Sequence, residues 1–402
     1  MTYSALALIA FNLVCFAGDP QGAPTTKNAG PPHGNGLSVQ DGVLLRDGLP
    51  YRGMGINVAS LADDILAKGE AATESFAAIE YLGQKKVPFI RFWASYFDNW
   101  KPYRQDPRQY WRNMDLLVAA CEKAHVGIVP TLFWTVWDVP YEFGEFRSAW
   151  LDPESETRKF MQQYVREFVS RYAKRDIVWF WEFSNENNLT WDLPNSITIL
   201  PEDRKDNRNI VRSYTGILAE RAFAREVRKY DPVRPISPGT SEPRESQFHI
   251  AAIPLKPGER WGSDTPEQTL EAVRWTVPEP MDLLSIHHYV SPSDYDPAAI
   301  RDAIKERLDW AAQLHKPLFL GEFGIVDKWV APVEGFDDEA YRRNLRDYFQ
   351  AIYEAGVPIA AYWAMTPKVQ PKIGAVSPGY TRFQYVMDLI AEYNQKVARS
   401  VR

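Results

Sequence analysis

Short apolar runs alternate with longer amphipathic segments along most of the chain. Apolar runs bounded by turn residues predict buried strands, and segments with apolar residues three or four positions apart predict helices. Strands and helices that alternate in this way are typical of a parallel sheet. We predict eight strand–helix pairs: Arg52–Val58 with Thr73–Lys85, Val87–Trp93 with Gln109–Ala124, Gly127–Phe133 with Glu154–Ala173, Ile177–Ser184 with Asn209–Tyr230, Pro235–Ser237 with Pro266–Arg274, Leu283–Tyr289 with Pro297–Leu314, Pro317–Phe323 with Asp338–Ala355, and Pro358–Met365 with Tyr380–Arg399.

Eight alternations predict a fold of the α/β class, a (β/α)8 TIM barrel that forms a single domain. An open doubly wound sheet is the alternative. No Gly-x-Gly-x-x-Gly follows a predicted strand, so dinucleotide binding is unsupported. Ahead of the barrel, Val39–Leu45 and Leu49–Arg52 flank Arg46-Asp47-Gly48. Asp-Gly between apolar alternations predicts an N-terminal β-hairpin.

The N-terminal segment resembles a secretory signal peptide. Ala5–Gly18 is apolar but too short to span a bilayer, small residues follow, and we expect Cys15-Phe16-Ala17 to serve as the cleavage site. The basic residues that usually precede such a segment are missing. We expect residues 1–17 to be a signal peptide, 18–36 a flexible linker rich in Pro and Gly, and 37–402 the barrel domain. We therefore expect a secreted or periplasmic protein that does not insert into a membrane.

Composition narrows the functional classes. The net charge is −6 with both signs interspersed, which argues against a nucleic-acid partner. The two cysteines lack metal-type spacing, and we expect neither a metal nor another cofactor. Aromatic residues make up 13% of the chain, with 14 Trp, which suits flat platforms for sugar rings or a partner protein. We expect a monomer.

One stretch, Ile177–Asn187, combines a buried strand with polar chemistry. An apolar and aromatic run ends in Asn185, Glu186 and Asn187. A carboxylate at the tip of a buried strand is costly unless something pairs or uses it. For Glu186 alone, a helix cap or a structural ion pair is an equal alternative to a functional role.

Other predicted strands also end in polar or aromatic residues, and in a barrel these ends share one rim. Each has a structural alternative: a core ion pair for Arg91, a core histidine for His287, plain packing for Trp363. Taken together, the alternatives are much less favoured. The candidate rim residues are Asn57, Arg91, Trp134, Trp137, Asn185, Glu186, His287, His288, Tyr289, Glu322 and Trp363.

Two carboxylates with aromatic platforms suit glycoside hydrolysis. One carboxyl group protonates the leaving oxygen, and the other attacks or assists at the anomeric carbon. Glu186 and Glu322 end the fourth and seventh strands, so they can face each other across the barrel mouth. Arg91 and the Tyr289 hydroxyl would keep the nucleophile ionised, whereas the acid needs an apolar or like-charged setting.

These residues resemble those of clan A glycoside hydrolases, and most of all family 5, the cellulase and β-mannanase family. The order Asn185-Glu186, His287-His288-Tyr289 and Gly321-Glu322-Phe323-Gly324, with Arg91 and Trp363, carries the resemblance over about Val39 to Met365. It implies retention by double displacement, with Glu186 as acid/base and Glu322 as nucleophile. It also implies that Asn185 holds the 2-hydroxyl, Arg91 and Tyr289 bind Glu322, His287 contacts sugar, and Trp363 stacks beneath the −1 ring.

Two positions depart from the family pattern. Asn187 stands where the family usually has Pro, and Phe133-Trp134 stands where many members have His. Ile90–Ala94 is similar to the second strand of the β-mannanases. The loops Trp134–Trp150 and Asn187–Asn209 are rich in aromatic or polar residues, and we interpret them as cleft walls with stacking subsites; packing on the barrel is the alternative.

The leading hypothesis is a retaining glycoside hydrolase that cleaves β-linked glycans of the β-1,4-mannan or β-glucan type. Its partner would be an oligo- or polysaccharide. A non-catalytic carbohydrate-binding barrel and a transglycosylase that uses the same residues are the alternatives.

Overall fold

The computed structural model describes residues 36–94, 100–252, 262–291, 294–325, 338–365 and 381–400. The predicted signal peptide and all of the predicted linker except Gly36 lie outside these residues. All of the described residues belong to one compact unit. No helix within the described ranges has the length and apolar character that crossing a membrane requires.

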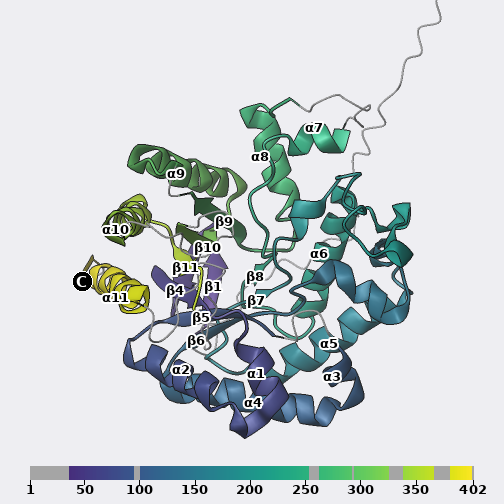
Figure 1. Ribbon diagram of the computed structural model, residues 1–402, viewed down its shortest axis with the longest axis horizontal. Coiled ribbons are helices and arrows are strands. Elements are labelled where there is room, and N and C mark those ends of the chain that lie inside the picture. Colours follow the sequence, from purple (N-terminus) through teal and green to yellow (C-terminus); the bar gives the residue numbers. More distant parts are fainter. Residues whose placement is uncertain are drawn as a thin grey trace, which may run out of the picture. The chain divides into compact units, whose positions relative to one another are not determined.

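Eight parallel strands form a nearly closed barrel, which confirms the predicted TIM-barrel fold (Figure 1). Their order in the sheet is β8-β7-β6-β5-β4-β11-β10-β9. Backbone hydrogen bonds from Asp282 and Leu283 to the Ile236 carbonyl link the two outer strands. The strands are β4 (Gly53–Asn57), β5 (Phe89–Trp93), β6 (Gly127–Thr131), β7 (Trp181–Glu182), β8 (Ile236–Ser237), β9 (Leu284–Val290), β10 (Leu318–Ile325) and β11 (Ile359–Tyr362).

Helices surround the strands as the hydrophobic spacing predicts (Figure 1). Ser155 accepts from the Arg158 amide and so caps α5, and Thr265 forms a capping box at the start of α8. The predicted helices correspond to α2 (Thr73–Gln84), α4 (Pro107–Ala124), α5 (Glu156–Tyr172), α6 (Ser213–Arg228), α8 (Pro266–Trp275), α9 (Pro297–Leu314), α10 (Asp338–Ala355) and α11 (Thr381–Ser400). Three short α-helices of the described residues were not predicted: α1 (Leu61–Lys68), α3 (Lys101–Gln105) and α7 (Gln247–Ala252).

The N-terminal sheet has three strands rather than two. The predicted strand Val39–Leu45 is wrong as one element, because Asp41 and Gly42 have φ values of 52° and 75° and turn the chain between β1 (Leu37–Gln40) and β2 (Val43–Arg46). The expected turn at Asp47-Gly48 does lead from β2 into β3 (Leu49–Pro50). Two Asp-Gly turns therefore build two successive hairpins.

This small sheet closes one end of the barrel interior. Leu37 and Leu44 are each 1% exposed and belong to one apolar cluster with Phe89, Trp179 and Phe319 of the barrel. The cluster lies toward the N-terminal halves of the strands, opposite the rim that carries the candidate residues. In this fold the end away from the active site serves stability.

The fourth strand is much shorter than the predicted Ile177–Ser184, with only Trp181–Glu182 in regular pairing. Its neighbour β8 is flanked by Pro235 and Pro238, which have no N–H to donate to a ladder. The remaining backbone is still bonded, since the Phe183 amide donates to Ser237 and the Ser184 amide to Pro238. The segment therefore keeps its place in the barrel wall without forming a regular ladder.

Candidate active site

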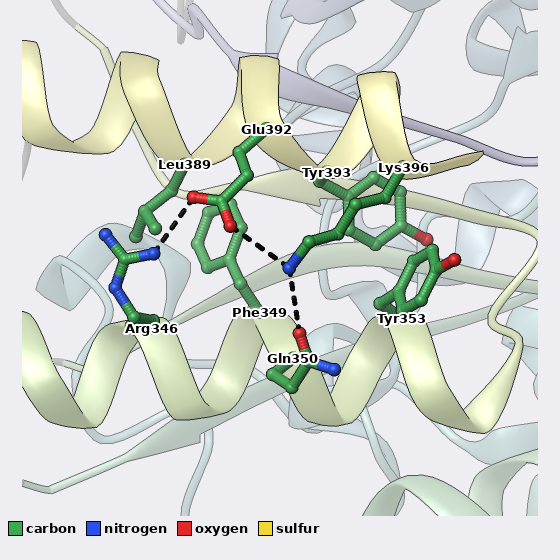
Figure 2. Close-up of a pocket in the computed structure, with 8 residues that line it drawn as sticks. All are labelled: Arg346, Phe349, Gln350, Tyr353, Leu389, Glu392, Tyr393 and Lys396. Atoms are coloured by element: carbon green, nitrogen blue, oxygen red, sulfur yellow. Dashed lines mark hydrogen bonds and ion pairs between the residues drawn. The ribbon is translucent and has the colours of Figure 1, made fainter. Parts of the chain in front are cut away.

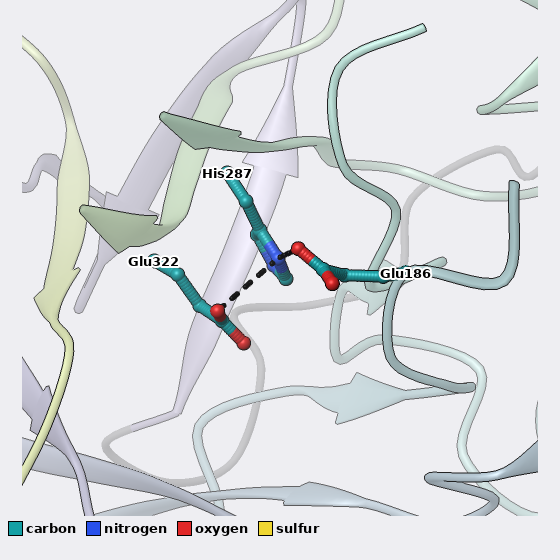
Figure 3. A group of neighbouring side chains, drawn as sticks. All are labelled: Glu186, His287 and Glu322. Atoms are coloured by element: carbon teal, nitrogen blue, oxygen red, sulfur yellow. Dashed lines mark hydrogen bonds and ion pairs between the residues drawn. The ribbon is translucent and has the colours of Figure 1, made fainter. Parts of the chain in front are cut away.

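The two predicted carboxylates meet at the strand ends with one histidine between them. Figure 3 shows the His287 ring between Glu186 and Glu322. His287 Nδ1 lies 3.0 Å from Glu186 Oε1 and 3.5 Å from Glu322 Oε2. An oxygen of Glu186 and an oxygen of Glu322 approach within 4.8 Å of each other. The structure thus brings together, on three different strand ends, side chains that the sequence separates widely.

Arg91 of β5 is the centre of the polar network. Its Nη1 donates to Glu322 Oε1 at 2.7 Å and to Asn57 Oδ1 at 3.0 Å. Its Nη2 donates to Asn185 Oδ1 at 2.9 Å, and its Nε to Glu182 Oε1 at 2.6 Å. The side chain is fully buried, so its charge needs these anions. Arg91 is therefore both a core ion-pair residue and a neighbour of the proposed nucleophile.

Glu182 is the functional neighbour that sequence reasoning missed. Its carboxylate is fully buried and accepts from Arg91, from Thr131 Oγ1 at 2.6 Å and from Ser237 Oγ at 3.0 Å. A signal was present, because a charged residue inside the aromatic run Trp179–Phe183 needs a buried cation. Arg91, equally buried in β5, was the candidate partner.

Burial sets the protonation of the residues around Glu322. It lowers the pKa of His287 to about 4, so this imidazole is neutral near pH 7. Burial also raises the pKa of Glu322, and the nearby Glu186 carboxylate adds to the increase, whereas the Arg91 charge and a hydrogen bond from the Tyr289 hydroxyl oppose it. The contact with Arg91 thus favours the ionised form of Glu322.

Glu186 has the environment that a proton donor needs. Burial raises its pKa, and the more distant Arg91 charge and the Ser241 hydroxyl only partly counter this effect. The residue has φ 48° and ψ 31°, a left-handed conformation that costs a non-glycine residue about 1–2 kcal/mol. Its amide donates to the Gly239 carbonyl at 2.8 Å. A Cβ on Gly239 would lie 1.8 Å from Ser184 O, so only glycine allows this approach.

Two of the predicted tryptophans lie against each other at the site. The Trp134 and Trp363 rings stack with centroids 6.2 Å apart, and Trp134 covers the Arg91 guanidinium at 4.7 Å from its centroid. Trp137 lies farther back: it is 6% exposed and its Nε1 donates to the Asn187 carbonyl at 2.8 Å. Trp137 therefore holds the segment that follows Glu186 against the barrel wall.

The other aromatic side chains of the Trp134–Trp150 loop pack on neighbouring elements. Trp150 is fully buried, the Tyr141 ring lies under Arg204, and the Phe146 ring lies under Arg208. In the second loop, Trp191 is 1% exposed. These contacts favour the packing alternative over stacking subsites for these residues.

The described residues also contain a hollow away from the strand ends. It lies between α10 and α11, where Arg346 and Lys396 both pair with Glu392 and Lys396 also reaches Gln350 (Figure 2). Its volume of about 20 Å³ is room for about one water molecule. This hollow is too small for a sugar.

Glu186, His287 and Glu322 also offer donor atoms of the kinds that bind divalent metals. Arg91 already occupies Glu322 Oε1, and the Tyr289 hydroxyl occupies Oε2. The positive charge that a metal would bring is thus supplied by a guanidinium. The donor set fits proton transfer and nucleophilic attack better than metal binding.

Comparisons with known proteins identify the family of the chain. Residues 78–368 match the family model described as cellulase, glycosyl hydrolase family 5. A family 5 mannosidase from Rhizomucor miehei is 16% identical, with 90% of this chain and 98% of that chain covered and a TM-score of 0.62. An endo-1,4-β-D-mannanase from Thermotoga petrophila RKU-1 is 14% identical over 86% of this chain and 99% of that one, with a TM-score of 0.59.

A Bacteroidetes-affiliated cellulase of the same family is 15% identical, covering 85% of this chain and 91% of that one, with a TM-score of 0.56. At such identities the structures establish the fold alone. No curated protein matches the chain at a significant level. The family model covers well over half of the sequence and includes both Glu186 and Glu322. The chain belongs to glycoside hydrolase family 5.

Proposed function

We propose that this family 5 protein is a retaining β-glycosidase that cleaves β-1,4-mannan or β-glucan by double displacement. One observation carries the proposal: oxygens of Glu186 and Glu322 lie within 4.8 Å of each other. Retaining enzymes hold their two carboxyl groups about 5–5.5 Å apart, and inverting enzymes about 6.5–9.5 Å apart. A gap this short leaves no room for a water molecule beside the sugar, as inversion requires.

The two carboxylates divide the work by their surroundings. Glu322, ionised beside Arg91, attacks the anomeric carbon and forms a glycosyl–enzyme ester, while Glu186 gives its proton to the leaving oxygen. Glu186, now a carboxylate, then removes a proton from water, which cleaves the ester and restores both groups. His287 contacts Glu186 and remains neutral near pH 7, so it orients that carboxyl group without adding a charge.

A β-mannan substrate is the first choice among β-linked glycans. The support is the likeness of Ile90–Ala94 to the second strand of the β-mannanases, together with the mannosidase and mannanase among similar structures. A panel of mannan, glucan, xylan and galactan with products sized by chromatography tests the choice and separates endo from exo cleavage. Release of products from xylan or galactan alone would contradict it.

Two variants test the mechanism. Glu322→Ala and Glu186→Ala should each lower turnover by several orders of magnitude. Azide should rescue Glu322→Ala with inverted glycosyl azide, because the small anion enters from the face that the nucleophile has left. It should rescue Glu186→Ala with retained product, because it replaces the water of the second step. Full activity in either variant would overturn the proposal.

We also propose that the protein is exported, on the strength of the apolar stretch Ala5–Gly18. Expression with its own N-terminus, followed by N-terminal sequencing of the protein outside the cytoplasm, tests this proposal. Recovery of uncleaved protein in the cytoplasm alone would contradict it.

A further inference from the structure

Behind the acid/base residue lies a buried polar pair that the mechanism above does not use. Asn187 directly follows Glu186, and its Nδ2 donates to Ser184 Oγ at 2.6 Å and to Glu220 Oε1 at 3.0 Å. Asn187 is 2% exposed and Glu220 is fully buried. Both hydrogens of the Asn187 amide are thus engaged, one within its own segment and one to α6.

Glu220 is a buried carboxyl group without a cation. Among the described residues it has no ion pair, and the Asn187 amide is its hydrogen-bond donor. Burial raises its pKa well above the usual range, and that single hydrogen bond opposes the increase only weakly. The surroundings of Glu220 therefore favour the neutral carboxylic acid, since an isolated buried carboxylate is costly. It offers Asn187 an acceptor without placing a second negative charge behind Glu186.

The same face of α6 receives the segment after Glu186 at a second point. Gly216 lies one helical turn before Glu220, and a Cβ there would lie 2.0 Å from Cζ2 of Trp191. Trp191 is the residue directly after the 3-10 helix Asn187–Thr190. Glu220 accepts a hydrogen bond from Asn187, the first residue of that helix. On one face of α6, Gly216 thus leaves room for Trp191, and Glu220 binds Asn187. The two ends of the short helix both contact this face.

We propose that Glu220 is a positioning residue, which holds Glu186 in its proton-donating position through Asn187. This inference rests on the proposed function of Glu186 as acid/base. Glu186 adopts a left-handed backbone conformation, so its carboxyl group keeps its direction only while the residues on both sides are fixed. Before Glu186, the backbone N–H of Asn185 donates to the Trp134 carbonyl at 3.2 Å. After Glu186, the side chain of Asn187 is held by Glu220.

The test separates proton donation from the rest of catalysis. A sugar with a dinitrophenol leaving group needs no proton in the first step, whereas one with a poor leaving group such as methylphenol does. The probes are these two aryl glycosides of mannobiose and of cellobiose, and the quantity is kcat/KM, which reports the steps up to glycosyl–enzyme formation. We compare wild type with Glu220→Met, which removes the acceptor at similar volume, and with Glu220→Gln, which keeps a neutral acceptor.

The expected result for Glu220→Met is a loss of about 10²-fold in kcat/KM on the methylphenyl glycoside, the order that a misplacement near 1 Å produces. On the dinitrophenyl glycoside, kcat/KM of Glu220→Met should stay within about twofold of wild type. Glu220→Gln should restore kcat/KM on the methylphenyl glycoside to nearly the wild-type value. Asn187→Ala breaks the same link from the other end without touching the helix, and it should show the same split if Glu220→Met fails to fold.

Glu226→Met on the same helix is the matched control, because its buried carboxylate bonds Lys229 and Tyr230 instead of the acid/base segment. Glu226→Met should leave kcat/KM at the wild-type value on both the methylphenyl and the dinitrophenyl glycosides. Equal losses on both leaving groups, or no loss on either, in Glu220→Met and Asn187→Ala would overturn the positioning role alone. If the wild-type enzyme turns over none of the four aryl glycosides, the proposed function fails, and the positioning role fails with it.

Discussion

Arg91 Nη1 donates to Glu322 Oε1 at 2.7 Å, although the two residues are 231 positions apart in the chain. The same guanidinium binds Glu182 through Nε at 2.6 Å. One buried cation therefore serves two carboxylates, of which Glu322 is the proposed nucleophile. Because each carboxylate competes for this charge, a change at either partner should alter how readily Glu322 ionises.

Removal of the Arg91 charge should suppress catalysis at low pH. In Arg91→Met, Glu322 loses its contacting cation, so its pKa rises by about 1–3 units and the acidic limb of kcat/KM moves to higher pH. At its new optimum, kcat should fall by about 10²-fold or more. Arg91→Lys keeps the charge and should shift the limb less. An unchanged limb in Arg91→Met, with the fold verified by circular dichroism, would contradict this role.

Removal of the Glu182 charge should have the opposite effect. In Glu182→Gln the side-chain oxygen still accepts from Arg91 and Thr131, and the amide group can donate to Ser237. Arg91 then serves Glu322 alone, so the pKa of Glu322 falls and the acidic limb of kcat/KM moves to lower pH, by about 1 unit. The measurement is the pH profile on one soluble substrate beside that of Arg91→Met. Shifts of the same sign in the two variants would refute the sharing of one cation.

Glu220 should make the enzyme less stable as the pH rises. Its folded-state pKa is raised, so above the unfolded pKa of about 4.3 the folded protein binds one more proton than the unfolded chain. The free energy of unfolding then decreases with pH, by at most about 1.4 kcal/mol per unit, until the folded pKa is reached. Urea titrations of wild type and Glu220→Gln between pH 5 and pH 8 should show this slope in the difference, with Glu220→Gln gaining relative stability.

The control for that slope is Glu226→Gln on the same helix, where Lys229 is already paired with the carboxylate. Its difference from wild type should vary less with pH than that of Glu220→Gln. A constant difference between wild type and Glu220→Gln across the range would mean that Glu220 is ionised in the folded protein.

The small sheet at the far end of the barrel should contribute stability and leave activity alone. Leu44→Ala removes a side chain that is 1% exposed among Phe89, Trp179 and Phe319, and it should lower the free energy of unfolding by about 2–5 kcal/mol. Leu49→Ala, on the same sheet at 65% exposure, should be nearly neutral. Urea denaturation measures both. A tenfold loss of kcat in folded Leu44→Ala would contradict the assignment of this end to stability.

The barrel could be predicted because its signals are local. Apolar runs and helical spacing repeat eight times, Ser155 caps α5, and α9 and α10 begin and end at the predicted residues. One error concerns a local signal: Asp41-Gly42 is a turn of the same kind as Asp47-Gly48, and it divides the predicted strand Val39–Leu45. The other depends on a neighbour, since β7 pairs regularly with β8 at only two positions.

Only part of the candidate site could be predicted, because only part of it depends on local signals. Strand-end positions of Glu186, Glu322, His287 and Tyr289 follow from element order, since parallel strands of a barrel end at one rim. The pairing of Arg91 with Glu182, and of Asn187 with Glu220, depends on which buried side chains approach within about 3 Å, and no local pattern encodes that distance.

By itself, the sequence determined the order of strands and helices and the chemistry at the strand ends, because hydrophobic periodicity and residue type are properties of short segments. Only the tertiary structure decided which charges surround each carboxyl group and so which way its pKa shifts. The pKa of Glu322 depends on a cation from β5, and the pKa of Glu220 depends on the absence of one among the described residues around it. Electrostatic energies fall with distance in space rather than along the chain, so folding alone sets them.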